Sequence, residues 1–208
     1  MKTNPTVFLL TVCAATLMAA GCKAPPQIKT VAGDSVPTMQ TNRFTGTWIS
    51  GGGRKGVVAT RIKDAQAGVV EVAMLNADKD EIKLAKFDVS IRHSPEVGLL
   101  WSANEKSFAD DDQEREKLPG NYFFGRLVIT GEHFVVHLAD EDEIEKLVER
   151  GVLKASYAKN DKGEDTGPPI LEALGKEQFD AMSTNGVNPV LLFKPDPDFV
   201  FARLNAED

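Results

Sequence analysis

Hydrophobic and polar residues alternate in short segments between residues 44 and 139, with turn-forming residues between the segments. Alternation with a period of two is typical of β-strands that bury one face. Two polar linkers, at residues 76–80 and 130–132, have the composition of hairpin turns, and consecutive hairpins predict an antiparallel meander. The predicted strands in this part of the chain are residues 44–50, 55–63, 68–75, 81–92, 97–103, 121–130 and 133–139.

The predicted strand at residues 81–92 contains a break in its alternation. Its apolar residues fall on even positions up to Leu84 and on odd positions from Phe87 onward. A one-residue slip in a period-two pattern is typical of a β-bulge, which bends a strand and increases its twist. We therefore expect a bulge near residues 85–86 and a sheet that curls towards a barrel.

After residue 139 helices and strands are mixed. Residues 140–151 read DEDEIEKLVERG, with Asp140 as the predicted N-cap and Gly151 after the last turn, which indicates a helix. A second helix is predicted over residues 169–182. The fold class is mostly β: an antiparallel up-and-down meander of about 8–10 strands that forms a barrel or half-barrel, with two short helices in the C-terminal half. The remaining predicted strands are residues 152–158, 189–193 and 198–204.

The first 21 residues read as an export signal. They begin with a single cation at Lys2, continue with an apolar stretch at residues 6–20, and end in small residues before a cysteine. The apolar stretch is shorter than the roughly 20 residues that a transmembrane helix needs. We therefore expect residues 1–21 to be a signal peptide that is cleaved off.

The residues Ala19-Ala20-Gly21-Cys22 resemble the lipobox of bacterial lipoproteins. In that family the cysteine thiol receives a diacylglycerol, and cleavage leaves the acylated cysteine as the first residue. The resemblance implies cleavage between Gly21 and Cys22, with lipid attachment at Cys22. The alternative is an ordinary secretory signal that contains a cysteine by chance.

An acylated N-terminus makes the lipid bilayer the first expected partner, because two or more acyl chains hold a protein durably on a membrane. Lys23 stands where an Asp favours the inner membrane in Gram-negative lipoproteins, so the resemblance implies the cell envelope at the periplasmic face of the outer membrane. Residues 22–43 contain prolines and small polar residues without hydrophobic periodicity, which predicts a lipidated N-terminus followed by a flexible tether. Residues 44–208 are then expected to form a single domain.

Charge and cysteine content narrow the expected partners. The chain has 24 Lys and Arg against 31 Asp and Glu, which gives a formal net charge of −7. An acidic chain argues against nucleic-acid binding and against adhesion of the domain itself to anionic headgroups. Cys13 lies inside the predicted signal, so Cys22 would be the only cysteine of the mature chain and no intramolecular disulfide is expected.

The sequence FTGTW at residues 44–48 contains a Gly-x-Trp pattern that resembles the entry motif of the lipocalin family. In lipocalins this Trp closes one end of an up-and-down barrel, and an Arg near the last strand stacks over it. The resemblance implies that Trp48 and Arg203 form such a barrel-end structural pair, which is sensible because a guanidinium is attracted to the face of an indole. It also implies that residues 44–208 are a lipocalin-like β domain.

Candidate metal ligands are scattered along the chain. His133 and His137 share a face of one predicted strand, but four residues of strand span about 13 Å, which is too far for one metal ion. The acidic run at residues 110–117 and the turn at residues 160–165 contain possible calcium ligands, although solvated loops are the simpler interpretation. The glycines at residues 50–56 precede a strand and not a helix, which favours a hairpin loop over a phosphate site.

The sequence predicts no catalytic residue, metal ion or cofactor, because it contains no nucleophile elbow and its predicted mature part has only one cysteine, Cys22. The aromatic residues of the predicted strands fit a packed core better than the wall of a cavity, so ligand-binding residues are not assigned. We expect a non-catalytic, membrane-anchored envelope lipoprotein that binds an apolar small ligand or a polypeptide. The alternative is a structural or assembly lipoprotein that docks on an envelope protein through its surface, and an enzyme has the least support.

Overall fold

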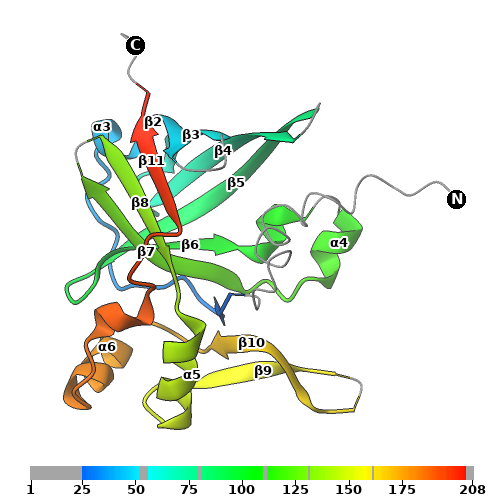
Figure 1. Ribbon diagram of the computed structural model, residues 1–208, viewed down its shortest axis with the longest axis vertical. Helices are drawn as coiled ribbons and strands as arrows, with labels where there is room; N and C mark the ends of the chain where they lie inside the picture. Colours follow the sequence, from blue (N-terminus) through cyan, green and yellow to red (C-terminus); the bar gives the residue numbers. More distant parts are fainter. Residues whose placement is uncertain are drawn as a thin grey trace, which may run out of the picture.

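The computed structural model describes residues 25–51, 56–78, 81–109, 112–130, 132–160 and 162–204. The predicted signal peptide and its cleavage site, Gly21 and Cys22, lie outside these residues. The described residues form a mostly β structure, as the sequence predicts (Figure 1).

Antiparallel strands close into a barrel of eight. The first seven pair in chain order, and the last strand lies between the seventh and the first and completes the ring. This closed meander confirms the predicted barrel. The barrel strands are β2 (Gly46–Gly51), β3 (Gly56–Asp64), β4 (Val69–Asp78), β5 (Glu81–Ser94), β6 (Gly98–Asn104), β7 (Tyr122–Thr130), β8 (His133–Leu138) and β11 (Phe199–Arg203).

A smaller layer lies below the barrel in Figure 1. Strand β1 pairs with the first two residues of β7 and runs parallel to the end of β10, whereas β8 pairs with the rest of β7. Most of this layer comes from the chain between β8 and β11. Its elements are β1 (Gln27–Ile28), α5 (Glu141–Glu149), β9 (Ala155–Lys159), β10 (Asp165–Leu171), α6 (Lys176–Thr184) and the 3-10 helix η3 (Pro189–Leu192).

Two hydrophobic cores stabilise the molecule. One lies inside the barrel, where Phe44 packs with Leu99 of β6 and Leu127 of β7. The other lies between the barrel wall and the lower layer, and it includes Leu100 of β6 and Phe124 of β7 together with residues of α5, α6 and η3. Successive residues of a strand point to opposite faces, and each face of β6 and β7 packs against one of the two cores. Both strands are therefore buried on both faces, which explains their almost continuous apolar sequences.

The structure differs from the prediction of a flexible tether at residues 22–43. The described part of this segment is packed against the domain: Pro26 is less than 2% exposed, and Ile28 and Ala32 are both 0% exposed. These residues belong to the lower layer and its core, and their irregular spacing leaves no periodic signal in the sequence. Residues 25–43 therefore belong to the folded region, which does not begin at residue 44.

The predicted bulge near residues 85–86 is wrong, because β4 and β5 keep one register over their whole length. Leu84 lies opposite Leu75 on the outer face of this hairpin, and the two side chains are 55% and 41% exposed. The slip in the sequence therefore marks the point along β5 where the apolar residues change from the outer to the inner face. The register shift of the barrel lies instead in β3, between Ile62 and Asp64.

Two predictions in the C-terminal part are also wrong. Residues 189–193 are predicted as a strand, but Pro189 begins the 3-10 helix η3. The helix predicted over residues 169–182 begins only at Lys176 and becomes α6, because residues 165–171 form β10.

Two prolines make β10 difficult to recognise as a strand in the sequence. Pro168 and Pro169 lie where the pairing of β9 with β10 shifts register, between Thr166 and Ile170. A proline is tolerated at such a shift because the ladder requires no backbone N–H there. Propensity alone therefore predicts a loop or a helix start at this position.

Candidate ligand-binding sites

One end of the barrel, which we call the narrow end, is closed by the short helix α3 (Thr41–Phe44) and by the start of β2, and we call the opposite end the wide end. Phe44 is 2% exposed and belongs to the barrel core. Trp48 is 1% exposed, and its Nε1 donates a hydrogen bond to Oγ1 of Thr60 at 3.0 Å. The buried indole N–H is thereby satisfied, so this end of the barrel is sealed by well-packed side chains.

Arg203 lies over Trp48, with its Cζ 4.4 Å from the centroid of the ring. Its guanidinium donates hydrogen bonds to the backbone oxygens of Thr45 (3.1 Å) and Asn42 (2.6 Å), and its Nε is 3.3 Å from a carboxylate oxygen of Glu132. The structure thus contains the pair that the lipocalin resemblance implies. Its role is structural, because these contacts tie α3 and the entry of β2 to the last strand.

Gly46 is required by this pair. A Cβ atom at position 46 would lie 2.9 Å from Nη1 of Arg203 and 3.6 Å from Nε1 of Trp48. A side chain here would displace the guanidinium from the indole. The glycine of the Gly-x-Trp pattern therefore follows from close packing, and not from a left-handed backbone.

One row of aromatic rings lines the barrel below this seal. The ring centroids of Trp48 and Phe134 are 5.5 Å apart, and those of Phe134 and Phe201 are 6.3 Å apart. Phe201 in turn stacks on Phe199 at 6.3 Å. The row therefore runs along β8 and β11 from the sealed end towards the wide end of the barrel.

A second row of aromatic rings lies across the barrel, at its wide end. Phe108, from the 3-10 helix η2 (Glu105–Phe108), has its ring centroid 4.8 Å from that of Phe87 on β5 and 5.9 Å from that of Phe123 on β7. Aromatic pairs at these distances add favourable contact energy to their burial. The connection between β6 and β7 thus contributes an aromatic wall to the barrel interior.

Large side chains that face the barrel interior are not uniformly buried. Several of them, such as Val70 and Leu127, are almost fully buried, whereas others remain partly exposed at both ends of the barrel, among them Phe134 near the seal and Phe87 towards the wide end, and Phe199 is 40% exposed. We call this solvent-reachable interior the aromatic cup. Its buried base includes Val70, Val89, Ile91, Leu99 and Leu127, and its partly exposed wall includes Val72, Phe87, Trp101, Val136 and Phe199.

A buried carboxylate holds the wide end together. Glu105 is 7% exposed, and its Oε1 accepts hydrogen bonds from the backbone N–H groups of Gly120 (2.6 Å) and Asn121 (2.9 Å). Its Oε2 accepts a third hydrogen bond from Nε2 of Gln27 at 3.1 Å. These hydrogen bonds satisfy both side-chain oxygens of Glu105 and fix η2 and β1 to the start of β7.

A second site lies beside β7, near the narrow end of the barrel. It is a cleft of about 550 Å³ between the segment at residues 35–43, the turn that joins β5 to β6, and residues 126–129 of β7. Figure 1 shows the blue N-terminal segment that forms one of its walls rising beside the barrel to α3. A cleft of this volume is within the usual range for ligand sites. We call it the β7 cleft.

Both charged residues that line the β7 cleft, Arg43 and Arg126, are positive. Its lining also contains His93, and it contains no Asp or Glu. Arg126 donates through Nε to the backbone oxygen of Val97 at 2.9 Å, which leaves its two terminal nitrogens for other partners. Among the described residues, neither arginine forms an ion pair with a carboxylate. No sequence pattern predicts that these two arginines share a cleft, because they are 83 positions apart and belong to no motif.

A smaller cleft of about 360 Å³ lies near the wide end, beside β5. Its charges are mostly paired on the surface: Lys63 bonds Asp88 at 2.6 Å, and Arg61 bonds Glu71 at 2.8 Å. The hydrogen bond from Arg61 holds the pKa of Glu71 below its ordinary value. Exposed ion pairs of this kind contribute little stability, and the cleft offers no set of groups aimed at one point.

The predicted polar candidates do not converge. His133 is exposed, and His137 shares a hydrogen bond of 2.9 Å through Nδ1 with the backbone oxygen of Lys194. Residues 112–117 of the acidic run form the short helix α4, whereas Asp110 and Asp111 lie outside the described residues. Within the described ranges, no three His, Cys, Asp or Glu side chains are grouped so that they could hold a metal ion.

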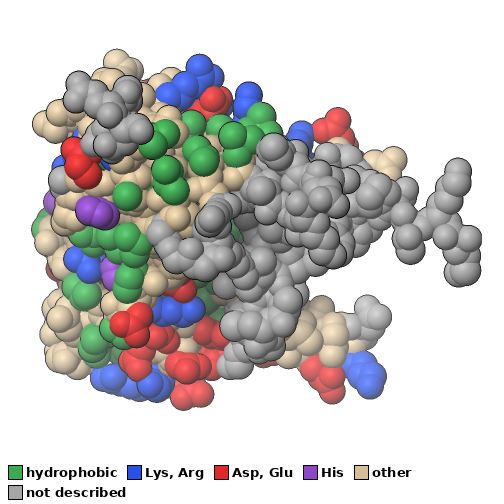
Figure 2. Space-filling model, turned by 45° about the horizontal axis from the view of Figure 1, so that its top comes forward, with side chains coloured by type: hydrophobic (Ala, Val, Ile, Leu, Met, Phe, Trp, Pro, Cys, Tyr) green, Lys and Arg blue, Asp and Glu red, His purple; other side chains and the backbone are tan. Residues whose placement is uncertain are grey.

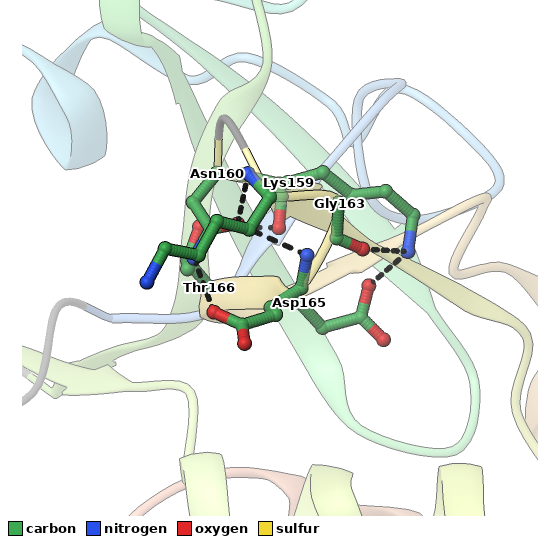
Figure 3. Close-up of polar contacts among 8 residues, drawn as sticks. Lys159, Asn160, Gly163, Asp165 and Thr166 are labelled. Atoms are coloured by element: carbon green, nitrogen blue, oxygen red, sulfur yellow. Dashed lines mark hydrogen bonds and ion pairs between the residues drawn. The ribbon is translucent and has the colours of Figure 1, made fainter.

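The turn at residues 160–165 uses its polar groups internally (Figure 3). Oδ1 of Asn160 accepts hydrogen bonds from the backbone N–H groups of Lys162 and Glu164, at 2.9 and 3.0 Å. Lys159 forms an ion pair with Asp165 at 2.6 Å across the hairpin. These contacts explain the composition of the turn as a hairpin that is closed by side-chain hydrogen bonds.

Acidic side chains gather on the lower part of the molecule in Figure 2, where α5 lies in Figure 1. They affect Tyr157 of the neighbouring β9: partial burial raises the pKa of its hydroxyl above the ordinary value, and Glu145 and Glu149 raise it further. This acidic lower face differs from the positively charged lining of the β7 cleft.

Comparisons with protein-family models, with curated proteins and with solved structures each found no match. Among the helices of the described residues, none combines the length and the apolar character that crossing a membrane requires.

Proposed function

We propose that this chain is a membrane-anchored bacterial envelope lipoprotein that binds an apolar small ligand in the aromatic cup, without catalysis. The anchor is an acylated Cys22, and the location is the periplasmic face of the outer membrane. The lipobox resemblance supports the anchor, and the closed barrel with the Trp48–Arg203 seal is the arrangement that the lipocalin resemblance implies. Ligand entry is from the wide end.

The observation that carries the proposal is the partial exposure of inward-facing aromatic side chains. Phe199 is 40% exposed, and Phe87 and Trp101 are partly exposed although they face the inside of a closed barrel. Apolar surface inside a concavity gains free energy when an apolar ligand removes it from water. A barrel of eight strands has room for a single small ligand when its side chains do not fill it.

Binding of a fluorescent apolar probe, 1-anilinonaphthalene-8-sulfonate, tests the cup. We expect the folded chain to enhance the fluorescence of the probe, and palmitate to displace it. Phe87→Glu is expected to weaken probe binding by at least about tenfold, because it introduces a charge into the cup. Leu84→Glu is the matched control, since it introduces the same charge on the outer face of the same strand, where Leu84 is 55% exposed. Equal loss in the two variants, or no binding by the unaltered chain, would contradict the proposal.

Membrane fractionation of cells that express Cys22→Ser tests the anchor. We expect this variant to lose acylation and to leave the membrane fraction, whereas Cys13→Ser remains membrane-bound because residue 13 lies in the predicted signal. Normal processing of Cys22→Ser, together with continued sedimentation with membranes, would rule out a lipid anchor at this residue.

A second candidate function is docking on an envelope protein. It is favoured by a row of apolar side chains on the outer face of the barrel, where Ile49, Val57, Leu75 and Leu84 are consecutive cross-strand neighbours on β2 to β5. Three of them are between 41% and 55% exposed. In native mass spectrometry of the delipidated chain purified from its own cells, a co-purifying small molecule would favour the cup, and a protein lost on Leu84→Glu substitution would favour docking.

A further inference from the structure

The β7 cleft contains a free sheet edge. Strand β6 pairs with β7 only as far as Leu99–Leu127, whereas β7 continues to Thr130 with β8 on its other side. Successive residues of an antiparallel strand direct their backbone N–H and C=O groups alternately to the two neighbouring strands. The stretch at residues 128–130 therefore directs backbone groups into the cleft, and no described strand pairs with them on that side.

The segment on the opposite wall does not use this edge. Residues 35–43 bond through their backbone to His93, through Ser35, and within the turn that leads into α3. Among the described residues, none of these backbone hydrogen bonds reaches residues 128–130. The gap between the wall and β7 is thus bordered by an unpaired strand edge. Such an edge is a template for another extended chain.

The charge of the cleft determines which side chains the extended partner carries. Arg43 and Arg126 line the gap, and the acidic residues that flank its lining segments have other partners. Asp34 accepts the backbone N–H of Lys176, Glu96 accepts the hydroxyl of Ser94, and Glu132 lies 3.3 Å from Nε of Arg203. A guanidinium binds carboxylates through two parallel hydrogen bonds. In a chain with a net charge of −7, an all-cationic cleft is complementary to an anionic partner and not to the remainder of this surface.

We propose that the β7 cleft binds an extended acidic polypeptide segment, which adds as a strand to the edge of β7 at residues 128–130 and places its carboxylates on Arg43 and Arg126. Backbone hydrogen bonds supply affinity independent of sequence, and the two arginines select acidic side chains. The cleft shares Leu99 and Leu127 with the buried base of the aromatic cup, but its two arginines lie outside the barrel near the sealed end, away from the partly exposed wall of the cup.

Short synthetic peptides of defined composition test this site by fluorescence anisotropy. The first alternates threonine and glutamate, the second alternates threonine and glutamine, and the third repeats the first with every backbone nitrogen methylated. We expect only the first to bind measurably, because the second lacks carboxylates and the third lacks N–H donors. Equal binding of the first and second would exclude recognition by arginine. Equal binding of the first and third would exclude strand addition, and no binding by any of them would overturn the proposal.

Substitutions locate the site. Arg43→Gln is expected to weaken binding of the acidic peptide by about tenfold, and the guanidinium of Arg43 forms no hydrogen bond with the described residues, so the fold is expected to be preserved. Arg150→Gln is the matched control, with the same change of charge at an exposed position after α5. An equal effect of the two substitutions would show that peptide binding depends only on the net charge of the chain, and it would contradict the proposed site. Binding of the apolar probe to the cup should be unchanged in Arg43→Gln, so the two sites fail or succeed separately.

Discussion

At the scale of single residues, the closed end of the barrel depends on Arg203. Its guanidinium lies 4.4 Å from the ring centroid of Trp48 and is bonded to two backbone oxygens of the chain that precedes β2. Hydrogen bonds to a charged group and cation–π contacts each contribute on the order of 1–2 kcal/mol when partly buried.

We predict that Arg203→Met lowers the free energy of unfolding by about 2–4 kcal/mol, because it removes all of these contacts and leaves carbonyl groups without a donor. Arg203→Lys should lower it by less, since the ammonium keeps the charge but cannot bond both oxygens and cover the ring at once. Urea unfolding followed by fluorescence measures the difference. The control is Arg150→Met, an exposed arginine with the same change of side chain; a loss as large there as at Arg203 would show that the seal is not what matters.

The seal brings together three residues to which a sequence motif draws attention. Gly46, Trp48 and Arg203 were assigned through a family resemblance, and the structure brings all three into contact. The arginines of the β7 cleft could not be found in the same way. Arg126 looks like any outward residue of a strand, and Arg43 lies in a segment whose packing gives no periodic signal. Only the closure of the barrel places them on one cleft.

At the scale of elements, regular alternation predicted the strands of the barrel, because each has one face in the core. Helix α5 was also predicted from local signals, which are the residues at its two ends. Oδ1 of Asp140 accepts the N–H of Glu143 at 3.2 Å, and Gly151 follows the helix with a φ of 69°. The elements that were missed, β1 and β10, are short or contain prolines, and their pairing depends on contacts distant in sequence. Local patterns cannot encode such pairing.

The packing of β1 leads to a prediction that separates a folded segment from a tether. Ile28 is 0% exposed and is paired with both Tyr122 and Leu171. Ile28→Ala should lower the free energy of unfolding by about 2–4 kcal/mol, because it leaves a cavity in the lower core. Urea unfolding measures it. Leu84→Ala is the control and should change stability by less than about 0.5 kcal/mol at its exposed position. A flexible tether would give no loss for Ile28→Ala.

At the scale of the whole molecule, the described structure changes what an anchor at Cys22 would mean. Only Lys23 and Ala24 lie between that cysteine and the first described residue, Pro25. Three steps of extended chain span at most about 10 Å. Under the proposed lipid anchor, the domain therefore lies against the headgroups, with β1 and the lower layer close to the membrane, and does not hang at a distance from it.

Neutron reflectometry of the acylated chain on a supported bilayer measures this distance. We predict that the protein layer begins at the headgroups without an intervening layer of solvent. Insertion of about twenty Gly and Ser residues after Lys23 should separate them by a root-mean-square distance of about 25 Å, because such a linker behaves as a flexible coil. A solvent gap of that size in the unaltered chain would show that residues 25–43 leave the domain when the protein is anchored. The height of the domain above the membrane thus reports directly on whether β1 stays paired with β7 and β10 in the anchored state.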